Sequence, residues 1–347
     1  MLEKLKRLRE KLRPRKQWQV VWIRRLLTVA VSAGILSFYF NRVDWHELGH
    51  AFARANLWIF IPARLLQVVF YLFLDVYLLQ RLLVWFHGPI KYSRVLYGRS
   101  ALYILSLINT QLANGGMFLY LMREAKILAR KLLGLVIFRF TWSVWALNAG
   151  VTLALIATVA FRLPYHSSIP LKTIAIAVAF FWGTLVFAFS VVYYFARYRP
   201  NAQHGLTWGV FFQAKPGHCL TVGSLTLLSA VGGLVSNYYC ARSFGLRIPL
   251  HEMVLLLPFA DLISTLPIAF MSLGTTTFAW QTMWRSYGTT EEFLSFTLAL
   301  PVATYCMRAL IALVALPRAS REMQGLISLV RNSPEESLVE DPGPQEK

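Results

Sequence analysis

The sequence predicts an all-α, polytopic membrane protein with about six full spans and two re-entrant or broken hairpins. Hydrophobic residues make up 56% of the 347-residue chain and aromatic residues 14%, and the mean hydropathy is +0.51. Soluble domains contain about 45–50% apolar residues and lack apolar runs of about 20 residues. Composition therefore excludes an ordinary soluble domain, and we expect the chain to lie in a bilayer.

Five apolar runs with few or no charges are long enough to cross a membrane, and a sixth carries only Arg308. We predict that each of the six crosses it once. These segments are 22–40, 57–79, 132–161, 173–195, 219–240 and 293–316.

Charge places the ends of the chain. The first 25 residues hold ten Lys or Arg residues against Glu3 and Glu10, so the positive-inside rule predicts a cytoplasmic N terminus. We expect a basic segment at 1–21, a membrane domain at 22–316 and a disordered, acidic tail at 317–347. Both termini would be cytoplasmic and the protein would be a multi-pass protein of the cell (inner) membrane.

Two further apolar segments, 95–122 and 251–284, are interrupted by polar and Gly- or Pro-containing stretches. Irregular backbone at membrane depth is tolerated only where it is buried in protein or lines a watery cavity. The segments that flank the first, 80–100 and 123–131, are both basic, so we expect a hairpin that enters and leaves at the cytoplasmic face. The second would enter from the opposite face, which suggests an inverted repeat of the kind found in transporters.

A polar stripe in the second span is the clearest candidate site. Arg64, Gln67, Tyr71 and Asp75 recur at steps of three, four and four, which places them on one helical face. Such a face would guide a lipid headgroup, with Arg64 attracting its phosphate; alternatively, each residue is satisfied by another helix or snorkels to an interface. Arg64 and Asp75 would lie roughly 16 Å apart along the axis, too far to pair directly.

Three other ionisable residues lie inside apolar segments. Arg139 and Arg308 invite the same two interpretations, and Arg139 lies close enough to the end of its span to reach the cytoplasmic surface. Asp261 would relay a proton, bind a cation or cap a broken helix, with Ser264 and Thr265 three and four residues further on.

The interrupted stretches supply the remaining candidates. Their polar side chains either line the substrate path or hydrogen-bond the freed backbone of the hairpin, and their Gly residues would permit the turns. The candidates are Asn109, Gln111, Asn114, Gly115 and Gly116 in the first stretch and Pro267 and Gly274 in the second.

These stretches resemble a known family. Leu266-Pro267-Ile268-Ala269 followed by Leu273-Gly274, and Asn109 before Gly115-Gly116 and Tyr120-Leu121-Met122-Arg123, are similar to the transmembrane domain of the lysylphosphatidylglycerol synthase family, whose members are called flippase-like. The resemblance covers about residues 20–320 and implies lipid transport in the cell envelope.

The chain also departs from that family. Met117 stands where an acid is common, and the turn at 272–277 lacks the usual Arg-Glu. The aminoacyltransferase domain that follows the membrane part in some relatives has no counterpart here, so we expect no synthase activity.

One motif indicates a different class. His46-Glu47-Leu48-Gly49-His50 matches H-E-x-x-H, a zinc protease signature on a helix. No third His or Glu ligand follows nearby, so we favour a helix lying on the outer surface and expect no metal and no cofactor. The three cysteines lack C-x-x-C spacing and would pack as small apolar residues.

The sequence thus favours a transporter, not an enzyme, that moves an anionic lipid or lipid-linked headgroup between leaflets. The net charge of +19 occurs without a nucleic-acid-binding module, so membrane lipids are the expected partners. A non-transporting lipid-binding or envelope-assembly factor, with an envelope enzyme as partner, is the alternative, and a zinc metalloprotease is the second alternative.

Overall fold

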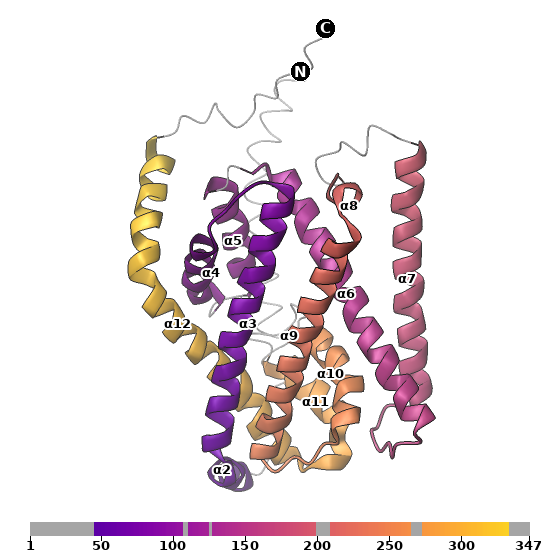
Figure 1. Ribbon diagram of the computed structural model, residues 1–347. Coiled ribbons are helices and arrows are strands. Elements are labelled where there is room, and N and C mark those ends of the chain that lie inside the picture. Colours follow the sequence, from indigo (N-terminus) through magenta and orange to yellow (C-terminus); the bar gives the residue numbers. More distant parts are fainter. Residues whose placement is uncertain (1–44, 107–109, 125–126, 199–208, 265–272, 333–347) are drawn as a thin grey trace, which may run out of the picture.

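The computed structural model describes residues 45–106, 110–124, 127–198, 209–264 and 273–332, and throughout these ranges the regular structure is helical (Figure 1). Five helices are long and apolar enough to cross a bilayer. They are α3 (Leu57–Phe86), α6 (Ala129–Ala160), α7 (Leu171–Tyr198), α9 (Pro216–Ser243) and α12 (Thr290–Asn332). The chain is therefore an all-α, multi-pass membrane protein. Five of the six predicted spans match these helices, and 22–40 lies outside the described residues.

The long helices define two ends of the bundle. We call the end where α3 ends and α6 begins the upper end, and the end where α3 begins and α6 ends the lower end, as they appear in Figure 1. Helix α2 (Trp45–Arg54) lies across the lower end, where Phe52 packs edge-on against Phe244 with ring centroids 6.0 Å apart. The motif 46–50 thus belongs to a surface helix, as the sequence predicted.

Four shorter helices form two pairs. Helices α4 (Tyr92–Ser106) and α5 (Thr110–Glu124) occupy the upper half, and α10 (Leu250–Ser264) and α11 (Leu273–Trp284) occupy the lower half (Figure 1). Each has 15 residues or fewer, so none exceeds about 23 Å, which is less than the thickness of a bilayer core. Each pair therefore enters and leaves at one end of the bundle.

The packing of the two halves follows the same scheme in opposite orientation. Helix α4 packs against α12, and α10 packs against α6; α3 packs against α9. If α3 is exchanged with α9, α4 with α10, α5 with α11 and α6 with α12, the first two contacts change places and the third is unchanged. The two hairpins thus occupy equivalent places at opposite ends.

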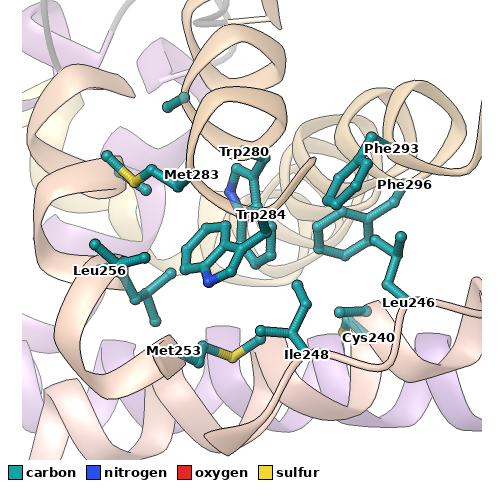
Figure 2. Packing of buried hydrophobic residues seen from close by; sticks show 14 of the residues in the cluster. Cys240, Leu246, Ile248, Met253, Leu256, Trp280, Met283, Trp284, Phe293 and Phe296 are labelled. Atoms are coloured by element: carbon teal, nitrogen blue, oxygen red, sulfur yellow. The ribbon is translucent and has the colours of Figure 1, made fainter. Parts of the chain in front are cut away.

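Apolar cores hold each half together. In the lower half Trp280 and Trp284 are at most 2% exposed and pack among Met253, Phe293 and Phe296 (Figure 2). In the upper half the core joins α3, α4, α5 and α6, with Leu82, Val95, Leu132 and Phe138 at most 1% exposed.

Two short helices and one extension complete the described chain. Helix α8 (Gly209–Gln213) precedes α9 at the upper end, and a 3-10 turn, η3 (Arg285–Tyr287), follows α11 at the lower end. The apolar part of α12 ends near the predicted boundary at 316, but the helix itself continues to Asn332.

The prediction that Gly115 and Gly116 form the turn of the first hairpin was wrong. Both lie inside α5, and the turn falls between α4 and α5. A Cβ atom at Gly116 would lie 2.8 Å from Leu102 Cδ2, so this glycine permits close packing of α5 on α4. Gly274 likewise lies in the first turn of α11.

Candidate functional site: a central polar cavity

A cavity of about 750 Å³ lies inside the bundle, lined mainly by α3, α6, α9, α10 and α12. All four members of the predicted stripe line it: Arg64, Gln67, Tyr71 and Asp75. Ser143 and Thr226 also line it and form a hydrogen bond, with their hydroxyl oxygens 3.1 Å apart. The polar face of α3 therefore borders an internal space between helices.

Arg64 is held by neutral groups. Its Nε donates to Thr304 Oγ1 at 2.7 Å, and its Nη1 donates to Asn237 Oδ1 at 3.3 Å and to Gln67 Oε1. No carboxylate in the described chain lies within ion-pairing distance of it. The guanidinium is thus oriented by α3, α9 and α12 and keeps its charge uncompensated.

Asp75 lies at the centre of an ionic cluster. Its side chain is 2% exposed and accepts hydrogen bonds from Arg99 Nε at 2.8 Å and from Arg139 Nη2. Arg99 also donates to Asn114 Oδ1 at 3.1 Å. This cluster links α3, α4, α5 and α6. Arg64 and Asp75 have separate partners, as their predicted separation requires.

Arg139 does not act as a surface residue. It lines the cavity and forms an ion pair with Asp75, whereas the sequence predicted that its side chain could extend to the membrane surface. The physical reason is that Asp75 lies on the facing side of α3, and a buried carboxylate needs a cationic partner.

Arg308 lacks a carboxylate partner within the described chain. Its guanidinium carbon lies 5.3 Å from the centroid of the Tyr103 ring, in a cation–π contact between α12 and α4. Arg308 Nε and Tyr103 Oη are both buried, and neither has a hydrogen-bond partner there. Two donors are therefore left unsatisfied beside the cavity, which is rare in a native structure.

Asp261 faces the cavity from α10, and its side chain is exposed to that space. No described residue bonds or ion-pairs with it, although Arg64 and Asp261 lie within electrostatic range of each other. Helix α10 continues to Ser264, so a capping role for Asp261 finds no support.

The other predicted residues lie away from this space or outside the described chain. Asn114, Gly115 and Gly116 belong to α5 and do not line the cavity; Asn114 contributes only through Arg99. Of these three, Asn114 and Gly115 are exposed, and Gly116 packs against Leu102 and Leu105 of α4. Asn109, Thr265 and Pro267 lie outside the described residues, as do the side chains of Gln111 and Ser264, and Gly274 lies in α11.

Sequence reasoning missed Arg99 and Tyr103. Arg99 was assigned to a basic loop, but α4 begins at Tyr92 and carries Arg99 beside Asp75. The sequence did hold one indication of a buried Arg99: it lies at the start of an apolar stretch, one helical turn before Tyr103. Tyr103 gave no signal, because an aromatic residue in an apolar run is ordinary.

The zinc motif gains no further ligand in the described chain. His46 and His50 are exposed on α2, with ring centroids 4.4 Å apart. Among the residues described, no three His, Cys, Asp or Glu side chains are grouped so as to hold a metal ion.

No family model, curated protein or solved structure matches the chain. The resemblance to the flippase-like family therefore stays a prediction. The site must be interpreted from its own chemistry.

That chemistry is dominated by positive charge. Four guanidiniums line the cavity or bind its lining, against two carboxylates among the described residues. They are Arg64, Arg99, Arg139 and Arg308, against Asp75 and Asp261. A concave, low-dielectric site with surplus positive charge attracts anions.

Proposed function

We propose that this protein moves an anionic lipid headgroup between the leaflets of the cell membrane. The observation that carries the proposal is the positively charged cavity inside a bundle that has two hairpins inserted from opposite ends. The predicted resemblance to flippase-like proteins points the same way.

The rim of the cavity suits a lipid. Phe140 of α6 and Val231 of α9 line the cavity, and they are 68% and 53% exposed. Apolar side chains that reach both the cavity and the outside provide a lateral passage between the two. The headgroup would enter between them while the acyl chains stay in the hydrocarbon.

The opposed hairpins supply a means of alternating access. In transporters built from inverted repeats, substrate sites lie between the repeats near the membrane midplane, and rocking of one repeat against the other opens each side in turn. The exchangeable packing of α3, α4 and α6 with α9, α10 and α12 fits that scheme.

The charge of the loops gives the orientation. Basic residues cluster at the upper end in the segments 80–94 and 123–131, which contain Arg81, Lys91, Arg94, Arg123, Arg130 and Lys131. By the positive-inside rule the upper end faces the cytoplasm. The α4/α5 hairpin then enters from the cytoplasm and the α10/α11 hairpin from outside.

Reconstitution tests the proposal. Purified protein in liposomes should accelerate the exposure of a fluorescent anionic phospholipid to a membrane-impermeant quencher, and Arg64→Gln combined with Arg308→Gln should abolish the acceleration. Arg81→Gln is the matched control, because Arg81 also stacks on a tyrosine, 5.1 Å from the Tyr77 ring, but lies outside the cavity.

Two outcomes would count against transport. Failure of the wild type to accelerate flipping for a panel of anionic lipids would remove the proposal. Tight lipid binding without any flipping would instead favour a non-transporting lipid-binding factor.

A further inference from the structure

The surplus charge of the cavity is concentrated in its upper part. Tyr103 lies within electrostatic range of Asp75, Arg99 and Arg308, and Arg139 pairs with Asp75 directly. Arg99 and Arg139 share the one carboxylate of Asp75, and Arg308 has no carboxylate partner in the described chain, so these residues together carry a net charge of +2. Arg64 lies within electrostatic range of both Arg308 and Asp261.

Buried charge of this size is costly unless something compensates it. An unpaired ion taken out of water loses several kcal/mol of solvation even after relaxation. Asp75 already accepts from two arginines, so it offers little further compensation to Arg308. No described residue supplies the missing partner, and an anion bound in the cavity would supply it.

The unsatisfied donors show where that anion would bind. Tyr103 is 4% exposed, and its hydroxyl has no acceptor in the described chain; the same holds for Arg308 Nε, which lies beside its ring. Tyr71, on the cavity side of α3, brings a second phenol to the same region. Guanidinium and phenol donors together suit the several acceptor oxygens of a phosphate.

We infer that the headgroup carried by this cavity ends in a phosphate monoester, which Arg308, Arg139 and Tyr103 receive. This inference rests on the proposed function for the lipid part and adds the chemical class of the headgroup. A phosphate monoester carries about −1.5 to −2 charges near neutral pH and three terminal oxygens, because its second pKa is about 6. It therefore matches the two surplus charges.

A phosphodiester headgroup fits less well. It carries one negative charge, so one guanidinium of the cluster would stay uncompensated, and it presents only two free oxygens. Inorganic phosphate has suitable charge but gains nothing from the apolar rim at Phe140 and Val231. The cavity thus favours a phosphate monoester attached to a lipid.

Competition binding tests this inference. Wild-type protein in neutral detergent is mixed with equal amounts of dioleoyl phosphatidic acid, a monoester, and dioleoyl phosphatidylglycerol, a diester, and the bound lipids are counted by native mass spectrometry. We expect the monoester to be preferred at least about tenfold, the factor that one additional charge-assisted hydrogen bond provides. Arg308→Gln should reduce this ratio toward one, while Arg81→Gln should leave it unchanged.

Acidity provides a second readout. Lowering the solution from about pH 7.5 to about pH 5 protonates the monoester but not the diester, so the preference should shrink severalfold in the wild type. Titration of the protein's own groups affects the binding of both lipids, so its effect cancels in the ratio of the two bound lipids. The charged and titratable groups that line this part of the cavity are Tyr71 and Asp75 of α3, Arg139 of α6, and Tyr305 and Arg308 of α12. Arg99 and Tyr103 of α4 contact Asp75 and Arg308, respectively, without lining it.

The arms of the experiment separate the possible failures. Equal retention of both lipids by the wild type, or a preference that survives in Arg308→Gln, would overturn the inference. Stable adducts of inorganic phosphate, with no preference between the two lipids, would show that the cavity binds a soluble anion and would overturn the inference that its ligand is a lipid. Equal flipping of both lipids in liposomes would support transport and reject the monoester, whereas monoester preference without flipping would support this inference and reject transport.

Discussion

The two hairpins occupy equivalent places but differ in the contacts that add to their apolar cores. The α4/α5 hairpin packs into the upper apolar core and is also joined to α3 by an ion pair, because Arg99 binds Asp75 and, within the hairpin, Asn114. The α10/α11 hairpin is held by a dry aromatic core, in which the Trp280 ring lies 4.5 Å from Trp284 and 4.7 Å from Phe296, centroid to centroid (Figure 2).

The lower end adds a polar clamp around that core. Glu252 is fully buried and accepts through Oε1 from the Tyr287 hydroxyl and from the His166 backbone N–H at 2.7 Å. Ser167 Oγ donates to the Met283 carbonyl at 2.6 Å. The loop after α6 is thus fastened to both ends of the α10/α11 hairpin.

The difference indicates which hairpin can move. Ionic contacts in a low-dielectric site can exchange one partner for a charged ligand at similar energy, whereas apolar packing has no substitute once it is separated. We therefore expect the α4/α5 hairpin to move when an anion binds and the α10/α11 hairpin to act as the fixed frame.

The largest effect should come from the fixed frame. Trp280→Ala removes a ring that is 2% exposed, and we expect a loss of about 4 kcal/mol of stability from lost burial and the cavity left behind. Thermal unfolding in detergent measures it. Phe278→Ala on the same helix, where the ring is 51% exposed, should change stability little. Similar losses of stability in both variants would contradict the expectation that the aromatic core fixes the α10/α11 hairpin.

Breaking the ionic cluster should be nearly as costly, but local. Asp75→Asn leaves Arg99 and Arg139 without a counter-charge, and removal of one partner of a buried ion pair costs about 3 kcal/mol or more. Hydrogen exchange should increase in α4 and α5 and stay unchanged in α10 and α11. Glu291→Gln, at the start of α12, is the control; an equal increase in both hairpins would remove the distinction between them.

The clamp should show a smaller effect that depends on pH. Burial, and then the bond to Glu252, raises the pKa of the Tyr287 phenol well above its ordinary value. Because the folded state holds the phenol proton more tightly, this stabilisation is complete below about pH 10 and is lost as the pH rises further.

Tyr287→Phe should therefore cost about 2 kcal/mol near neutral pH, the value of a hydrogen bond to a charged group. The difference in melting temperature between the variant and the wild type should shrink above about pH 10. A difference that stays constant with pH would mean that the hydroxyl plays no part in the clamp.

The smallest effect tests how α4 packs on α5. Gly116→Ala places a Cβ atom 2.8 Å from Leu102 Cδ2, whereas a Cβ atom at Gly115 would meet nothing within 4 Å. We expect Gly116→Ala to be less stable than Gly115→Ala by about 1 kcal/mol, since both gain the same helix propensity and only one is overpacked. Equal stability would show that Leu102 gives way without cost.

Much of this arrangement could be predicted from the chain alone. Apolar runs of membrane length predicted the helices α3, α6, α7, α9 and α12, and the step of three and four residues predicted the shared face of Arg64 and Asp75. The interruptions predicted two hairpins, but their glycines were misplaced, because Gly residues permit a turn and a close helix contact equally well.

Local pattern determined which segments are helical and which helical face is polar, since both follow from the period of a single helix and from the cost of polar groups in hydrocarbon. Only the tertiary structure decided the partners: that Arg99 and Arg139 share Asp75, that Arg308 meets Tyr103, and that Asp261 faces open space. These pairings join residues from different helices, and no periodicity within one helix specifies which face of another helix will meet it.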